Sequence, residues 1–337
     1  MNRKYFLNTQ TRIVAMLVCT MLMFNLHSLA QQSGRYNSFR PGQDWIADDG
    51  KPIDCHGGNI IYVDSLKTFF WYGEHYGTPR GVACYSSTDL YNWKNEGIAM
   101  EKVNIEILER PKVIYDKVNK RYVMWFHYDG NHYSIAELGV AVSNKPTGPF
   151  VLQKHFRPHG HESRDIGLYI DPETEKAYIG YAADHVNRTI RMVELTSDYL
   201  DVSTNDVDIE AHCEGPGILK KDGKFYLLTS GCTGWTPNAG HYYTSTSITG
   251  PYELQGSPFI GDAGDNSFNS QPCYIFKIPG YKNAYLYMGD RWNGFGGTHS
   301  QYVFLPITIT PAGKMELHFY REWDLSLFTP EKKRLQR

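Results

Sequence analysis

Short aromatic runs recur along the chain, and each of them follows a polar stretch that favours a turn. The runs lie at residues 69–72, 122–125, 178–181, 225–228 and 285–287. Aromatic residues favour β-strands, so each run is expected to be a strand that begins directly after a turn. The leading aromatic residues are about 50–60 residues apart, a spacing typical of a four-stranded repeat. The pattern therefore predicts five copies of one small antiparallel unit.

A second strand is expected after each aromatic run. These strands are predicted at residues 82–87, 140–143, 191–195, 242–245 and 302–305. Two of the units also share a closing phrase of Gly, Pro and an aromatic residue, at 148–150 and 250–252. Five such units fill residues 31–337, which predicts an all-β fold, a five-bladed β-propeller. A β-sandwich is the structural alternative, but it would not explain repetition at this period.

The composition agrees with this class and excludes others. The chain has 25 Tyr, 16 Phe, 7 Trp and 31 Gly, which suits short strands and tight turns. Its 34 basic and 36 acidic residues give a net charge of −2. This balance lacks the excess of basic residues that nucleic-acid binding requires, and 41% hydrophobic residues do not fit a disordered chain. Nucleic acid is therefore not an expected partner.

The N-terminal segment has the pattern of a signal peptide. Basic residues lie between Arg3 and Arg12, an apolar run covers residues 13–24, and small residues Ser28 and Ala30 precede Gln31. We expect cleavage after Ala30, so residues 1–30 form the signal peptide and the mature protein is periplasmic or extracellular. The apolar run is shorter than the ~20 residues that span a bilayer, so no membrane insertion of the mature protein is expected.

The cysteines suggest neither a metal site nor a full set of disulfides. A lipoprotein reading of Cys19 is disfavoured because Val18 stands where a small residue is needed. The mature chain keeps five cysteines, an odd number that leaves at least one thiol unbridged within a monomer. Cys213 and Cys232 are one candidate pair for a disulfide. The spacings match no metal-ligand motif, so no metal ligands are predicted.

Polar groups recur at the start of each expected innermost strand. The stretches are Asp54–Asn59, Glu109–Lys112, Ser163–Asp165, Glu214–Gly217 and Asn269–Pro272. Any one acidic residue alone would be read as a solvated surface charge. Innermost strands of a propeller converge on one axis, so five groups at equivalent positions are expected to line one funnel. Carboxylates that converge on an aromatic-lined pocket are what glycoside hydrolysis requires.

At these residues the chain resembles family 43 of the glycoside hydrolases, most of all the exo-β-1,3-galactanase branch. The motifs that carry the resemblance lie at residues 56–58, 71–74, 84–90, 109–112, 163–165, 214–216, 229–235 and 237–238. The resemblance implies an inverting exo-glycosidase that releases terminal galactose from β-1,3-galactan or arabinogalactan side chains. Its partner would be an oligo- or polysaccharide; the sequence makes no prediction about oligomeric state. Alternatives are an α-L-arabinofuranosidase, another family 43 specificity, or a non-catalytic sugar-binding propeller.

The resemblance also implies catalytic roles. Glu214 matches the general acid, Asp165 the carboxylate that raises the pKa of that acid, and Glu109 a group that holds sugar hydroxyls. The usual aspartate base is absent. Gln271 matches a glutamine of the galactanase branch that positions the attacking water or acts through its imidic tautomer. Asp54 is either a displaced base or a turn residue, and the turn interpretation is favoured because Asp is common in turns.

Further residues are expected to form the sugar-binding wall, because aromatic faces stack on pyranose rings and polar groups bind hydroxyls. The candidates are Glu74, Tyr133, Thr233, Trp235, Asn238 and Trp292. Trp235 is expected to be more exposed than Trp71 or Trp125, which lie inside strands. His56 is interpreted as a core histidine rather than a residue near a bound ion. No cofactor is expected; a central ion such as calcium is left open. Asn187 begins a glycosylation sequon.

Overall fold

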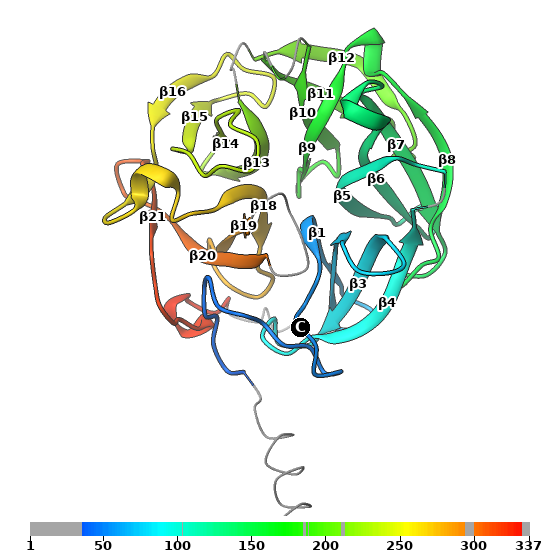
Figure 1. Ribbon diagram of the computed structural model, residues 1–337. Helices are drawn as coiled ribbons and strands as arrows, with labels where there is room; N and C mark the ends of the chain where they lie inside the picture. Colours follow the sequence, from blue (N-terminus) through cyan, green and yellow to red (C-terminus); the bar gives the residue numbers. More distant parts are fainter. Residues whose placement is uncertain are drawn as a thin grey trace, which may run out of the picture. The chain divides into compact units, whose positions relative to one another are not determined.

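Each aromatic run folds as the second strand of an antiparallel sheet, as predicted. The computed structural model describes residues 36–102, 104–184, 187, 189–209, 213–293 and 300–331. The chain divides into two units, residues 1–37 and 38–337. The predicted signal peptide lies outside the described residues. The second unit contains five sheets arranged as a five-bladed β-propeller, which confirms the predicted fold (Figure 1).

The first four blades have four strands each, and in each blade the strands follow chain order from the innermost strand outward, without crossovers. Blade 1 contains β1 (His56–Val63), β2 (Thr68–His75), β3 (Gly81–Ser87) and β4 (Lys94–Glu101). Blade 2 contains β5 (Ile107–Asp116), β6 (Arg121–Asp129), β7 (Glu137–Ser143) and β8 (Val151–Phe156). Blade 3 contains β9 (Ser163–Ile170), β10 (Ala177–Ala183), β11 (Thr189–Leu195) and β12 (Val202–Asp208). Blade 4 contains β13 (Glu214–Lys221), β14 (Lys224–Ser230), β15 (His241–Ser245) and β16 (Glu253–Gly256).

Blade 5 has a fifth strand. It contains β18 (Gln271–Lys277), β19 (Tyr285–Arg291), β20 (Gln301–Ile309) and β21 (Met315–His318), with β17 (Phe259–Ile260) pairing in parallel with β21. Four short 3₁₀ helices lie in connections: η1 (Asn131–Tyr133), η2 (Pro158–Gly160), η3 (Gly264–Asn266) and η4 (Leu325–Leu327). Among the described residues, no helix is both long and apolar enough to cross a membrane.

The apolar side chains form five clusters, each between two neighbouring blades. The cluster between blades 2 and 3, for example, packs Trp125 and Val140 against Leu168 and Tyr181. Strands buried on both faces in this way read as nearly continuous apolar runs. The faces of the sheets therefore hold the ring together, and the polar starts of the innermost strands remain available at one mouth of the ring.

The ring is closed between its first and last blades by a segment that precedes β1. The backbone N–H of Phe39 donates to the carbonyl of Trp323 at 2.7 Å, and the reverse bond is 3.0 Å long. The aromatic side chains of Phe39 and Trp323 also stack, with ring centroids 4.4 Å apart. Phe39 belongs to the same apolar cluster as Trp71 of blade 1 and Phe304 of blade 5. This cluster therefore joins the two ends of the sequence of blades.

Each innermost strand has a β-bulge near its start. In β1, His56 pairs with Glu74 but Asn59 pairs with Tyr72, so one residue is extra. The same one-residue shift occurs near the starts of β5, β9, β13 and β18. A bulge disrupts the alternation of side chains between the two faces and re-aims them. The five bulges therefore shape the mouth where the predicted site residues lie.

The candidate disulfide is absent. In the described part of the chain, Cys55, Cys84, Cys213, Cys232 and Cys273 form no disulfide with one another. Cys213 is the residue directly before β13, whereas the thiol of Cys232 lies 3.7 Å from the carbonyl oxygen of Asn187. Sequence spacing alone could not show that these two side chains have different neighbours.

The closing contact predicts a large loss of stability in Phe39→Ala. Phe39 is 1% exposed, and truncation of a buried Phe costs about 3–5 kcal/mol. The free energy of unfolding, measured by urea denaturation, should fall by that amount. Val118→Ala, at a side chain that is 84% exposed, is the control and should stay within about 0.5 kcal/mol. A loss below about 1 kcal/mol in Phe39→Ala would contradict the role of this contact in ring closure.

Candidate active site

Glu214, the first residue of β13, lies at the mouth formed by the bulges. It is 8% exposed. Its Oε1 accepts a hydrogen bond from Gln271 Nε2 at 2.9 Å, and its Oε2 accepts one from Asn187 Nδ2 at 2.7 Å. Burial, and then the neighbouring charge of Asp165, raise the pKa of Glu214 to about 8, against the opposing effects of Arg110 and these two donors. The carboxyl group therefore holds a proton at neutral pH, as a general acid must.

Asn187 is a site residue that the sequence reasoning missed. It lies between β10 and β11 with a left-handed backbone, φ 63°, and is 7% exposed. The sequon drew attention to it as a glycosylation acceptor, but its side-chain nitrogen binds Glu214. No signal in the repeat pattern could have found it, because it lies outside the repeated offset.

Arg110 is the second missed residue, and it occupies the centre of the mouth. Its Nη2 lies 2.8 Å from Asp165 Oδ2 and donates to Gln271 Oε1 at 2.5 Å. Its backbone N–H donates to Glu74 Oε1 at 2.9 Å. Burial opposes its charge, but Asp165 and then Glu74 raise the pKa of Arg110 further above its ordinary value. The guanidinium therefore remains charged, and Arg110 joins groups from four blades through its side chain and its backbone.

The backbone of Arg110 is unusual for its residue type. Arg110 has φ 53° in the bulge of β5, whereas the equivalent residues of β1 and β13 are Gly57 and Gly215, both with φ 63°. A left-handed conformation at a residue other than glycine costs about 1–3 kcal/mol. An arginine at a position that two other blades give to glycine was therefore the sequence signal for this residue.

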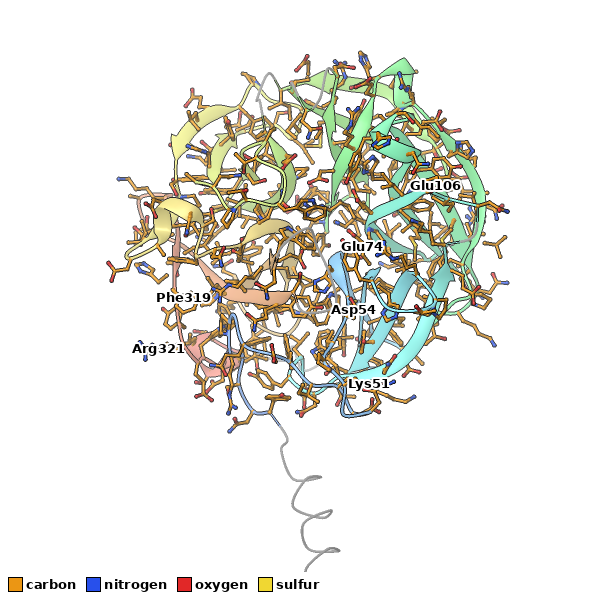
Figure 2. All side chains as sticks on the ribbon, in the orientation of Figure 1. Lys51, Asp54, Glu74, Glu106, Phe319 and Arg321 are labelled. Carbon is orange, nitrogen blue, oxygen red and sulfur yellow. The ribbon has the colours of Figure 1, made fainter. Side chains whose placement is uncertain are left out.

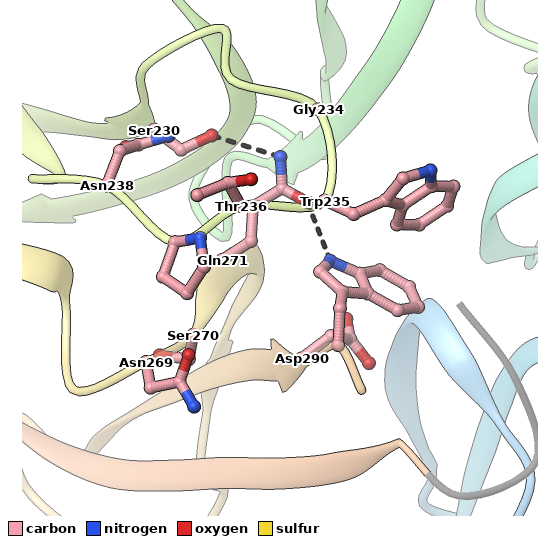
Figure 3. Close-up of a pocket in the computed structure, with 11 residues that line it drawn as sticks. Ser230, Gly234, Trp235, Thr236, Asn238, Asn269, Ser270, Gln271 and Asp290 are labelled. Carbon is pink, nitrogen blue, oxygen red and sulfur yellow. Dashed lines mark hydrogen bonds between the residues drawn. The ribbon is translucent and has the colours of Figure 1, made fainter. Parts of the chain in front are cut away.

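Gln271, the first residue of β18, is held from four sides. Besides its bonds to Arg110 and Glu214, its Oε1 accepts from Trp292 Nε1 at 2.9 Å and its Nε2 donates to Ser230 Oγ at 3.2 Å (Figure 3). In an inverting glycosidase the group that activates the attacking water lies across the site from the acid, roughly 6.5–9.5 Å away. In this structure Gln271 is instead in direct contact with Glu214.

Asp54 lies just before β1 and not in a turn of its own, but its carboxylate has a structural role in a connection elsewhere in the chain. Its Oδ2 accepts the backbone N–H groups of Tyr76 and Gly77, both at 3.0 Å, so it holds the connection after β2. It also pairs with His56 at 3.4 Å and His75 at 3.2 Å. Figure 2 shows Asp54 farther from the centre of the ring than Glu74.

His56 is a core histidine, as interpreted from the sequence. It is 0% exposed, its Nδ1 lies 3.3 Å from Asp290, and its ring stacks on Tyr302 at 4.9 Å. Burial opposes its charge, but the bonds to Asp290 and then Asp54 raise the pKa of His56 to about 9. The histidine therefore carries a charge that these two carboxylates neutralise.

Glu109 and Tyr133 form one side of the mouth. Tyr133 Oη donates to Glu109 Oε1 at 3.0 Å, and His127 Nδ1 lies 3.3 Å from Glu109 Oε2. Burial alone would raise the pKa of Glu109, but His127 and then Tyr133 lower it below its ordinary value. Tyr133 is 40% exposed. Glu109 is thus ionised beside an accessible phenol, an arrangement suited to binding hydroxyl groups.

Glu74 is deeper than the sequence suggested. It is 4% exposed and accepts a hydrogen bond from Tyr76 Oη at 2.6 Å. Burial, followed by the charge of Glu109, raises the pKa of Glu74 to about 7. It forms the floor of the mouth under Arg110 rather than an exposed wall.

The other predicted wall residues lie on the connection after β14 and at the end of β19. Asn238 holds that connection, because it accepts from the Gly231 N–H at 2.8 Å and donates to Thr233 Oγ1 at 2.6 Å. Trp235 is half-buried and packs edge-on against Trp292, with ring centroids 4.9 Å apart. Trp71 and Trp125 are buried between blades, so the expected contrast with Trp235 is confirmed.

Two cavities mark the ends of the central region. A pocket of about 10 Å³, the size of one water molecule, has Gln271, Trp235 and Trp292 among its lining residues (Figure 3). A much larger cavity of about 750 Å³ opens at the C-terminal ends of the innermost strands, away from the predicted acids. Cavity size alone would therefore have pointed to the wrong mouth.

One group of side chains has the residue types of a metal site. Glu109, His127 and Asp165 each place a ligand atom within 4.8 Å of the others. Asp165 is already paired with the Arg110 guanidinium at 2.8 Å, and His127 Nε2 lies 2.8 Å from Asp129 Oδ2. Burial opposes its charge, but Asp129 and then Glu109 raise the pKa of His127 to about 9. Two cationic side chains thus neutralise these carboxylates, so the group does not fit a divalent ion.

Known glycoside hydrolases are similar to this chain in sequence. The sequence profile of Glycosyl hydrolases family 43 matches residues 54–310. The β-D-galactofuranosidase xynD of Aspergillus niger is 26% identical over 245 residues, which are 63% of this chain and 69% of the relative.

Solved structures give a nearer likeness. The family 43 β-1,3-galactosidase BT0265 is 38% identical with a TM-score of 0.81, covering 86% of this chain and 64% of that chain. The β-1,3-galactosidase BT3683, solved with galactodeoxynojirimycin, is 31% identical with a TM-score of 0.81, covering 85% and 100%. An exo-β-1,3-galactanase of Phanerochaete chrysosporium, solved with β-1,3-galactotriose, is 30% identical with a TM-score of 0.78, covering 86% and 68%.

The electrostatics of Glu214 predict the pH dependence of glycoside cleavage. An acid works only while protonated, so the rate should fall as pH rises through about 8. Asp165→Asn removes a negative charge that raises this pKa, so the alkaline limb of kcat/KM should move to lower pH and the rate should fall. Glu173→Gln is the matched control: its carboxylate lies at the far cavity and is 77% exposed. An alkaline limb that does not move in Asp165→Asn would contradict the assignment.

Proposed function

The chain belongs to family 43 of the glycosyl hydrolases, and we propose that it is an inverting exo-β-1,3-galactosidase acting on galactan or arabinogalactan side chains. It is a glycoside hydrolase. The substrate proposal is supported by three solved relatives described as β-1,3-galactosidases or galactanases, at 30–38% identity. Because the chain spans 64% of BT0265, the activity of that whole protein is a proposal for this one.

The observation that carries the proposal is the pairing of Glu214 with Asp165. Glu214 is nearly buried with a pKa of about 8, and Asp165 is one cause of the shift. Sugar binding alone has no need for a carboxyl group kept protonated by a neighbouring carboxylate. This pairing favours an enzyme over a non-catalytic sugar-binding propeller.

In the proposed reaction Glu214 gives its proton to the oxygen of the departing sugar. Asp165 keeps Glu214 protonated before that step. Glu109 and Tyr133 bind hydroxyl groups of the terminal galactose, while Trp235 offers an aromatic face to the ring. Water attacks the anomeric carbon from the face opposite Glu214, which inverts its configuration.

A furanosidase is the second candidate. The Aspergillus niger relative is a β-D-galactofuranosidase, and α-L-arabinofuranosidase was the alternative from the sequence. A shared propeller with shared acids does not select the sugar. The identity of 26% to this relative is below that of the galactosidases, so the galactosidase proposal ranks first.

We also propose export. Its support is the signal-peptide pattern of residues 1–30. Export would place the enzyme where polysaccharide substrates occur.

The substrate proposal predicts which polymer the wild-type enzyme degrades. Incubation with β-1,3-galactan, arabinan and arabinoxylan in parallel should release monomeric galactose from the first alone, as measured by chromatography. Proton NMR at early times should show the α-anomer first, because the bond cleaved is β. Arabinose as the sole product would favour the second candidate and contradict the first.

The acid assignment predicts the behaviour of Glu214→Gln. The amide has the same shape but cannot donate the carboxyl proton, so kcat on β-1,3-galactan should fall by about 10²–10⁴. Calorimetric titration should still detect galactose binding, which shows that the mouth is intact. Retention of a tenth of wild-type kcat would remove Glu214 from this role.

A further inference from the structure

All four hydrogen-bonding positions of the Gln271 amide are occupied. Its oxygen accepts from Arg110 and Trp292, at 2.5 and 2.9 Å. Its nitrogen donates to Glu214 and Ser230, at 2.9 and 3.2 Å. A carbonyl oxygen has two lone pairs and an amide nitrogen has two protons, so no position is left over.

The two groups on the oxygen also fix which end of the amide is which. Guanidinium and indole nitrogens are donors with no acceptor capacity. The oxygen must therefore face Arg110 and Trp292, and the nitrogen must face the carboxyl group of Glu214. An imidic tautomer would carry a hydrogen on the oxygen, where it would meet these two donors and find no acceptor.

The backbone supports a specific need for Arg110. Its left-handed conformation is given to glycine at the equivalent positions 57 and 215. Glycine would adopt this conformation without strain, but it would remove the side-chain contacts of Arg110. Through these contacts the guanidinium bridges Asp165 and the Gln271 oxygen.

We infer that Arg110 and Trp292 are positioning residues that hold Gln271 in its amide form, with one N–H directed at Glu214 and the other at Ser230. Gln271 then acts on the acid side of the reaction and does not take the proton of the attacking water. The anomeric C–O bond breaks with its electrons on the leaving oxygen, which receives the proton of Glu214. The water oxygen bonds to the anomeric carbon, and the surplus proton of that water passes to solvent. The inference rests on the proposed glycosidase function.

The choice of leaving group separates the two roles of Gln271. A dinitrophenolate departs without protonation, whereas a sugar needs the acid. Gln271→Ala should therefore lose about 100-fold in kcat/KM on β-1,3-galactobiose and less than 5-fold on 2,4-dinitrophenyl β-galactoside, each relative to wild type. Glu214→Gln should show the same pattern. Added azide should not restore the rate of Gln271→Ala.

Two other outcomes would overturn the inference. Equal losses on both substrates with rescue by azide would assign Gln271 to the attacking water. Retention of full activity on both would show that Gln271 has no role. If the enzyme prefers another sugar, the same ratios are measured on the disaccharide and aryl glycoside of that sugar. The failure of the substrate proposal is thereby distinguishable from the failure of this inference.

Trp292→Phe tests the positioning role without a change of charge. It removes one donor to the Gln271 oxygen. The loss of kcat/KM in Trp292→Phe should therefore be smaller than in Gln271→Ala, but it should again be confined to the disaccharide. Trp235→Phe is the matched control, because its ring touches Trp292 but its N–H is not on Gln271 in the described contacts. Any loss in that variant should be equal on the two substrates; the same equality in Trp292→Phe would contradict the inference.

The tautomer can also be observed directly. In ¹⁵N-labelled wild-type enzyme, the Gln271 side chain should give two proton signals on one nitrogen, identified by their disappearance in Gln271→Ala. Both signals should persist when galactose is added. A single proton on that nitrogen would show the imidic form and overturn the inference.

Discussion

The geometry of the mouth depends on the ion pair between Arg110 and Asp165. The guanidinium of blade 2 binds Asp165 of blade 3 and Gln271 of blade 5, and the backbone of the same residue binds Glu74 of blade 1. Gln271 passes the connection on to Glu214 of blade 4. Arg110 and Gln271 together thus connect polar groups from all five blades. The positive charge of Arg110 offsets the repulsion between the carboxylates that surround it. Removal of one partner from such a buried ion pair is strongly destabilising.

The surroundings of the acidic residues also explain why their pKa values differ. Burial, and then the charge of Asp165, raise the pKa of Glu214 to about 8, although Arg110 and the two amide donors oppose this rise. Glu109 faces His127, whose positive charge lowers the pKa of Glu109. Two glutamates on neighbouring walls therefore have opposite protonation at neutral pH. Environments that push carboxyl pKa values apart are the usual way in which one site supplies both a proton donor and a charged binding group.

The fold was predictable from the sequence, because every blade contains the same turn followed by an aromatic strand. The side chains of these strands fill the apolar clusters between the blades, so the pattern recurs in each blade. The repeat also predicted that Glu109, Glu214 and Gln271 lie at or near the first residue of an innermost strand. Two features were not predictable. Asn187 reaches Glu214 from a connection outside the repeat. Arg110 contacts Asp165 and Gln271 from the bulge of β5, where its backbone is left-handed. Periodicity describes which face of a strand a residue takes, and a bulge breaks that rule.

The role of Glu214 as an acid requires that its surroundings keep it protonated at neutral pH. Infrared difference spectra between wild type and Glu214→Gln, recorded across a pH series, measure this directly, since protonated and ionised carboxyl groups absorb at different frequencies. We expect the carboxyl band of Glu214 to be present at pH 7 and to disappear with a midpoint near 8. A midpoint near the ordinary value of 4.5 for a glutamate would contradict the account.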